Sequence, residues 1–156
     1  MEVIMSIKQS NTAAAEVAEL TFNLLAGCQE KEERFAAQLK ITVSEFRCVR
    51  AFRGERSLPV KTLVERVKLS GSRLTRILTS LEKNGYLQRS IDLHDRRSIT
   101  VVLTKKGIDL SQRLEARYLQ IHEEILSGIP REMHAPLIAG LRNMLGSLER
   151  WLHHSR

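Results

Sequence analysis

The 156-residue chain lacks the features that define several classes of protein. Its two cysteines, Cys28 and Cys48, are too few for a disulfide framework, and their spacing matches no metal-binding knuckle. Aromatic residues make up only 4% of the sequence, which suits packed helices better than a β-sandwich. No apolar run approaches the roughly 20 residues that span a bilayer, and the first residues do not resemble a secretion signal. We therefore expect a cytoplasmic protein with no membrane partner.

Sequence signatures of catalysis and of metal binding are also missing. We find no glycine-rich phosphate loop, nucleophile elbow, HExxH sequence or paired-carboxylate motif. The five histidines show no ligand spacing with one another or with cysteine. These observations favour a protein that is not an enzyme, with no metal site and no cofactor.

Positive charge, by contrast, is concentrated in one part of the chain. The net charge is +7, and residues 56–97 hold ten lysines and arginines against four acidic residues, which leaves +1 for the rest. Such a field favours a polyanion, because neutralising phosphates releases condensed counterions. A solvated basic surface without a partner is the alternative, and charge alone does not separate the two.

Apolar residues at helical spacing predict a helix over the first forty residues, which Gly27 and the charged run 29–34 could bend or break. The sequence 42–45 forms a capping box, which predicts that a second helix starts near Val43 and ends before Gly54. Pro59 suits the first turn of a short third helix. Ser70 is a natural N-cap for a fourth helix, which Gly85 terminates in a left-handed conformation.

Alternating residues then predict a β-hairpin, with strands at 86–91 and 99–103 around a charged loop at 92–98. The helical period returns at Lys105 and stops at Gly128, and a last helix begins near Ala135, because Pro136 should not lie deep in a helix. With no repeat or linker, we expect a single domain over residues 1–156. The fold class is mainly α with a small β-hairpin wing, a winged helix-turn-helix.

The second helix of a helix-turn-helix pair has the width to enter the major groove of B-DNA. Small hydroxyl groups allow close approach to DNA, and arginine binds guanine or phosphate in a bidentate manner. The predicted DNA-binding residues of this recognition helix are Ser70, Ser72, Arg73, Thr75 and Arg76. Leu74 and Ile77 should point into the core. The alternative is an amphipathic surface helix with ordinary solvated charges.

Five collinear segments between Leu58 and Gly107 make the chain resemble the MarR family of transcription regulators. The segments are Leu63-Val64 with Leu69-Ser70, Leu74-Thr75-Arg76, residues 81–87, Asp95-Arg96-Arg97 and residues 103–107. Each segment by itself is weak evidence for the family, but the five segments in this order are specific to it. The first forty and last fifty residues agree with the family mainly in helical pattern.

The resemblance implies a ligand- or stress-responsive repressor that binds a pseudo-palindromic double-stranded DNA operator as a homodimer. By motif position, Arg97 is the wing arginine that enters the minor groove, Asp95 orients it, and Arg96 contacts phosphate. A narrow groove concentrates negative potential and attracts guanidinium groups, which agrees with this assignment. The alternative for Asp95 and Arg97 is a salt bridge that stabilises the hairpin without contacting DNA.

Residues 42–104, approximately, would form the DNA-binding lobe, and helices at about 10–40 and 105–153 would form the dimer interface. The apolar stripes on these terminal helices exceed what a small winged helix can cover, so we expect the helices to pair with those of a second copy across a two-fold axis. The predicted dimerisation residues are Leu137, Leu141, Leu145, Leu148, Trp151 and Leu152. A monomer that folds these helices back on itself is the alternative.

The sequence identifies no effector, although the family resemblance makes a small-molecule effector plausible. Cys28 is a weak candidate for a redox sensor, because its neighbours do not favour a thiolate. Cys48 lies on an apolar helix face and is expected in the core. A winged helix that binds protein is the rival function, but it would not need the basic block.

Overall fold

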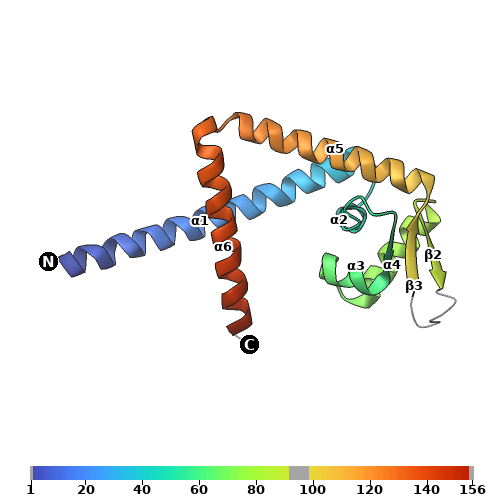
Figure 1. Cartoon of the computed structure of the whole chain (residues 1–156), viewed down its shortest axis with the longest axis horizontal. Helices are drawn as coiled ribbons and strands as arrows, with labels where there is room; N and C mark the ends of the chain where they lie inside the picture. The colour runs from blue at the N-terminus through green and yellow to red at the C-terminus, as the bar shows by residue number, and fades with distance from the viewer. Residues whose placement is uncertain (1, 92–98, 155–156) are drawn as a thin grey trace. The chain divides into compact units, whose positions relative to one another are not determined.

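The computed structural model of the chain describes residues 2–91 and 99–154, and the side chains of residues 12–90 and 99–154. Two compact units are present, residues 1–111 and 112–156. The elements follow the order α1 (Glu2–Gln38), α2 (Val43–Arg50), β1 (Ser57–Pro59), α3 (Val60–Val67), α4 (Gly71–Lys83), β2 (Leu87–Ile91), β3 (Ile99–Leu103), α5 (Lys105–Ser127), the short 3-10 helix η1 (Arg131–Met133) and α6 (His134–His154) (Figure 1). The predicted fold class, mainly helical with a winged helix-turn-helix, is confirmed, whereas the single domain stays a prediction.

Helix α1 runs without interruption through Gly27, so neither Gly27 nor the charged run after it breaks the helix. One glycine in a helix interior costs only about 1 kcal/mol. The charged run that follows supports the helix, because Arg34 and Glu30 form an ion pair one turn apart at 2.5 Å. The chain leaves α1 through Lys40, which has a left-handed φ of 56°.

The capping box before α2 is confirmed. The backbone N–H of Glu45 donates to the Thr42 hydroxyl over 3.2 Å, and the backbone N–H of Thr42 donates to the Glu45 carboxylate over 2.8 Å. Both groups would otherwise be unsatisfied at the start of a helix. The ring of Phe46 on α2 then packs edge-on against Phe35 of α1, with the centroids 5.3 Å apart.

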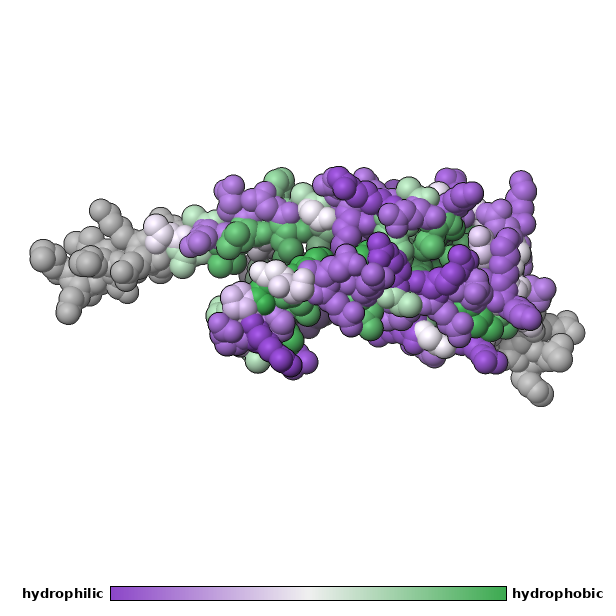
Figure 2. All heavy atoms as spheres, turned by 90° about the horizontal axis from the view of Figure 1, so that it is seen from above, coloured by the Kyte–Doolittle hydropathy of each residue, from purple (hydrophilic) through white to green (hydrophobic). Residues whose placement is uncertain are grey.

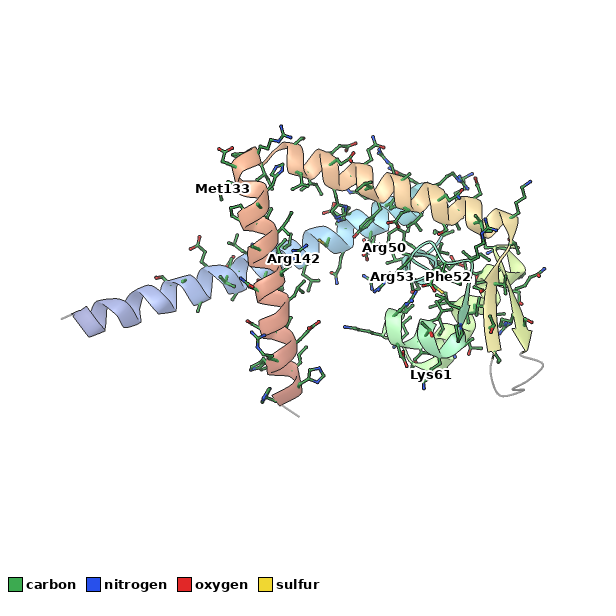
Figure 3. The ribbon with its side chains drawn as sticks, in the orientation of Figure 1. Arg50, Phe52, Arg53, Lys61, Met133 and Arg142 are labelled. Carbon is green, nitrogen blue, oxygen red and sulfur yellow. The ribbon has the colours of Figure 1, made fainter. Side chains whose placement is uncertain are left out.

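A single apolar core fills the first unit. Its buried side chains come from every helix and strand of this unit. They include Phe35, Phe46, Val49, Phe52, Leu58, Leu63, Leu74, Leu78, Leu81, Leu87, Val101, Leu103 and Leu110. Phe52, two residues past the end of α2, lies inside the first unit, whereas Lys61 lies on the outer side of α3 (Figure 3). Full burial of one such side chain contributes roughly 1.5–3 kcal/mol, so this core fixes α3 and α4 against the sheet.

The sheet has three antiparallel strands in the order β1-β3-β2, one more than the predicted hairpin. Strand β1 places Leu58 opposite Val101, and β2 places Arg89 opposite the same residue from the other side. Along β3, Val101 and Leu103 are buried while Val102 is exposed, as the alternation predicted. The additional strand is β1, the segment that leads into α3, and it pairs with the edge of β3 that β2 leaves open.

The second unit contains the C-terminal part of α5, the helix η1 and α6. The Nε2 atom of His134 lies 3.1 Å from the Leu126 carbonyl and 3.0 Å from the Ile129 carbonyl, so it closes the corner between α5 and α6. Helix α6 begins at His134, which leaves Pro136 in its first turn, as expected. Among the residues that the structure describes, no helix is both long and apolar enough to cross a bilayer.

Candidate nucleic-acid interface

The turn between α3 and α4 sets the start of the candidate recognition helix. Lys68 caps α3 with a left-handed backbone, at φ 55° and ψ 38°. Ser70 then takes the extended conformation of an N-cap, at φ −64° and ψ 149°, but its side chain makes no capping hydrogen bond. Its hydroxyl instead lies 3.3 Å from the hydroxyl of Ser72. Both hydroxyl groups are therefore at the surface, at the end of α4 that exposes free backbone N–H groups.

The five predicted contact residues share the outer side of the N-terminal half of α4. Their side chains, those of Ser70, Ser72, Arg73, Thr75 and Arg76, are all exposed. Leu74 is fully buried and Ile77 is half-buried, as the sequence predicted. Arg73 and Arg76 form no ion pair with any residue that the structure describes, so both guanidinium groups are available to a ligand.

Other arginines in and near the basic block already have acidic partners. Arg66 pairs with Glu55 at 2.6 Å and also donates to the Ala51 carbonyl, and Arg89 pairs with Glu82 at 2.5 Å. The block therefore offers a polyanion fewer unpaired charges than its composition suggests. Arg73 and Arg76 on α4 differ from these arginines, because neither pairs with an acidic residue in the part of the chain that the structure describes.

A buried carboxylate ties α4 to the start of α2. Glu45 is only 6% exposed, and besides its capping role it accepts a hydrogen bond from the Ser80 hydroxyl over 2.7 Å. Burial raises the pKa of the Glu45 carboxyl, but hydrogen bonds from Thr42 and Ser80 outweigh burial and hold the pKa below its ordinary value. Sequence reasoning found the capping box and missed this second contact, because Ser80 lies 35 residues away.

A second polar clamp ties α4 to strand β2. The Glu82 carboxylate accepts hydrogen bonds from the Arg89 backbone at 3.0 Å and from Arg89 Nε at 2.9 Å. The hydrogen bonds from the Arg89 side chain and backbone lower the pKa of Glu82 and keep it ionised. The same guanidinium group donates to the Thr79 hydroxyl over 3.3 Å. Arg89 thus holds the wing strand against α4, and its charge is neutralised.

A third set of contacts joins the end of α4 to the start of α5. Gly85 has the expected left-handed φ of 74°, and its carbonyl accepts from the Thr104 hydroxyl over 2.6 Å. Lys106 donates to the Asn84 carbonyl over 2.8 Å. A Cβ atom on Gly107 would lie 1.8 Å from the Tyr86 carbonyl oxygen, so only glycine fits there. Residues 84–86 and 104–107 therefore interlock.

The predicted wing residues Asp95, Arg96 and Arg97 lie outside the described residues. Strands β2 and β3, which flank residues 92–98 in the sequence, pair with each other, and the ion pair between Arg89 and Glu82 joins β2 to α4. Their roles stay predictions.

The two cysteines lie in different environments. Cys48 is fully buried, and burial together with the Glu45 charge raises the pKa of its thiol to about 12, which confirms its place in the core. Cys28 is half-buried on α1, and its sensor role stays a prediction. Within residues 12–90 and 99–154, no three histidine, cysteine or acidic side chains gather in a way that could hold a metal ion.

The predicted dimerisation residues lie along α6. Leu137 is half-buried, whereas Leu141, Leu145, Leu148, Trp151 and Leu152 are exposed, Trp151 by 64%. Helix α1 likewise exposes Val17, Leu20, Phe22, Leu24 and Leu25. Hydrophobic side chains also show between hydrophilic ones on the face seen in Figure 2. Exposed apolar surface on this scale marks an interaction surface.

Comparison with known sequences gives matches over most of the chain. The model of the MarR family matches residues 41–99. The chain is 31% identical over 109 residues to the HTH-type transcriptional regulator SarZ of Staphylococcus saprophyticus, covering 68% of this chain and 75% of that protein. It is 29% identical over 132 residues to SarZ of Staphylococcus haemolyticus, covering 83% and 88% respectively.

Solved structures share the fold at lower sequence identity. A substituted form of MepR from S. aureus has a TM-score of 0.71 at 20% identity, covering 84% of this chain and 97% of that chain. A second MepR variant, bound to an oligodeoxyribonucleotide, has a TM-score of 0.56 at 21% identity, with coverage of 84% and 96%. PcaV from Streptomyces coelicolor, in complex with its natural ligand, has a TM-score of 0.63 at 21% identity, with coverage of 80% and 91%.

Proposed function

The chain belongs to the MarR family of DNA-binding transcription regulators, and from this premise we propose that it is a cytoplasmic, homodimeric repressor of a pseudo-palindromic operator. The observation that carries the proposal is the outer face of α4, where two arginines that pair with none of the described acidic residues lie beside small hydroxyl side chains, on a helix whose other end is anchored. Basic and hydroxyl groups on a rigid helix match the edges and phosphates of the major groove.

In this proposal, the N-terminal half of α4 enters the major groove. Arg73 and Arg76 bind guanine or phosphate, while Ser70, Ser72 and Thr75 allow close approach. The wing brings Arg97 to the neighbouring minor groove, with Asp95 orienting it and Arg96 on a phosphate. Base contacts determine which sequence is bound, and phosphate contacts supply most of the affinity.

A second copy of the chain covers the apolar stripes of α1 and α6. Two recognition helices then lie about 34 Å apart, which fits half-sites one helical turn apart. The DNA complex of MepR and the ligand complex of PcaV support the proposal that this chain binds an operator and releases it when a small molecule binds. We propose no catalytic role.

The proposal is tested by selecting duplexes from a random pool with the full-length protein, then measuring affinity against salt. We expect an enriched, two-fold symmetric sequence and a steep fall of log affinity with log salt concentration. Arg73→Ala or Arg76→Ala should weaken specific binding by roughly 1–3 kcal/mol if the arginine binds a guanine. Equal loss on random duplex would make that arginine a phosphate contact instead.

The matched control is Arg131→Ala, which removes an exposed arginine from η1 and should leave specific binding unchanged. A flat salt dependence without an enriched sequence would refute the proposal and favour a winged helix that binds protein.

A further inference from the structure

The hydroxyl group of Thr75 is already used inside α4. Its Oγ1 donates a hydrogen bond over 2.9 Å to the carbonyl of Gly71, one turn earlier in the same helix. A threonine hydroxyl has one proton, so this bond leaves no proton to donate to a base. The side chain is nevertheless exposed, between the predicted contact residues Arg73 and Arg76.

The position of the hydroxyl fixes the position of the Thr75 methyl group. The Cβ atom of threonine carries two heavy atoms in staggered positions, and Oγ1 occupies the one that faces the preceding turn. The methyl group therefore lies in a different position from the hydroxyl, away from the Gly71 carbonyl, on a side chain that is exposed. Valine has the shape of threonine with a methyl group in place of the hydroxyl, so Thr75→Val keeps a branched side chain and removes only the hydroxyl group.

We propose that Thr75 determines specificity by binding a thymine through its methyl group, with its hydroxyl playing no part in reading the base. Thymine differs from the other bases in presenting a methyl group to the major groove, and threonine methyl is among the apolar groups that contact it. The inference rests on the proposed function, because it requires α4 to lie in the major groove. Beyond the proposed function, thymine is the base that Thr75 selects, and the methyl groups of the two residues make the contact.

Thr79 provides a matched control one turn further along the same helix. Its Oγ1 donates to the Thr75 carbonyl over 2.9 Å, a bond of the same type as the one from Thr75 to Gly71. Its hydroxyl also accepts a hydrogen bond from Arg89, so the wing strand lies against it. Replacing either threonine by serine removes one methyl group from an exposed position of α4 and keeps the hydroxyl.

The test uses the full-length protein and the duplex that it enriches from a random pool. Affinities are measured for Thr75→Ser, Thr75→Val and Thr79→Ser, with thermal unfolding as a check on folding. Each thymine of the selected half-site is also replaced in turn by deoxyuridine, which removes only the methyl group. Burying one methyl-sized group is worth about 0.8 kcal/mol, which corresponds to about a fourfold change in affinity per contact.

We expect Thr75→Ser to bind about fourfold more weakly per half-site, and Thr75→Val and Thr79→Ser to bind like the wild type. One thymine-to-deoxyuridine replacement should weaken the wild type and Thr75→Val by about fourfold and leave Thr75→Ser unaffected. This loss of sensitivity is the readout that a merely structural role of Thr75 would not produce.

Two results would overturn the inference while the proposed function survives. In one, Thr75→Val loses affinity and Thr75→Ser keeps it, which would assign the contact to the hydroxyl. In the other, every thymine replacement affects Thr75→Ser and the wild type equally. If the pool yields no enriched sequence at all, the proposed function itself fails.

Discussion

Replacing Gly107 with alanine tests the interlock between the end of α4 and the start of α5. The new Cβ would lie 1.8 Å from the Tyr86 carbonyl oxygen and 2.9 Å from its carbonyl carbon. Both atoms belong to the backbone, so no side-chain rotation relieves the clash. Real Cβ atoms essentially never approach closer than 3.0 Å, so the two segments must separate by at least about 1.2 Å.

That separation breaks the hydrogen bonds that join the two segments. The Thr104 N–H donates to the Tyr86 carbonyl at 3.0 Å, its hydroxyl donates to Gly85 at 2.6 Å, and Lys106 donates to Asn84 at 2.8 Å. At about 0.5–1.5 kcal/mol each, losing these three bonds costs roughly 1.5–4.5 kcal/mol. The better helix propensity of alanine returns about 1 kcal/mol. We expect a net loss of roughly 0.5–3.5 kcal/mol in the free energy of unfolding.

Urea unfolding, followed by circular dichroism at fixed protein concentration, measures this loss. The matched control is Gly27→Ala, because no atom beyond the adjoining residues and the neighbouring backbone of α1 lies within 4 Å of the Cβ that it adds. The control should be neutral or stabilising by up to about 1 kcal/mol. A Gly107→Ala variant as stable as its control would refute the close approach of the two segments.

Two further predictions concern the anchor of α4 and the dimer. Glu45→Gln should lower the free energy of unfolding by about 1.5–3 kcal/mol at neutral pH, because a charge-assisted hydrogen bond is weakened. Since the folded-state pKa of Glu45 lies below the ordinary 4.5, its contribution is complete above that value and is lost as the pH falls through the lower folded pKa. Urea unfolding over a pH series should therefore show the wild type and variant converging in acid, and a constant difference would contradict the assignment. Leu145→Glu should dissociate the dimer in sedimentation, because it places a charge on a 60% exposed leucine of the apolar stripe, whereas Asn143→Glu on the same helix should not. Two variants of equal dimer mass would disprove this interface.

Elements that depend on neighbouring residues were predictable from the sequence. The capping box at Thr42, the left-handed Gly85 and the burial of Leu74 each follow from residues within one or two turns. Strand β1 was missed because three residues ending in Pro59 form a strand only through pairing with β3, some forty residues later. The continuity of α1 through Gly27 was missed because the favourable ion pair after it was treated only as a charged run.

The exposed residues of the candidate site were predictable from the sequence, whereas the contacts that hold α4 in place were not. Helical spacing alone assigned Arg73 and Arg76 to the exposed side of α4, and the structure agrees. The ion pair of Arg89 with Glu82 and the bond from Ser80 to Glu45 join separate elements, so no local pattern announced them. As a result, the sequence counted Arg89 as part of a positive field, whereas the structure gives it an acidic partner.

These supports divide α4 into two halves with different tasks. Among the described residues, the polar contacts from α4 to other elements begin at Thr79 and Ser80 and continue past its end, where Lys106 binds the Asn84 carbonyl. The first two turns are fixed instead by the buried side chain of Leu74 and by the intrahelical bond of Thr75. A helix that is clamped at one end presents the other end in a fixed orientation, so little conformational entropy is lost when that end binds a ligand. Substitutions that remove a hydrogen-bonding group of the clamps, such as Ser80→Ala, should therefore reduce affinity for all duplexes, while substitutions in the first two turns should change which duplex is preferred.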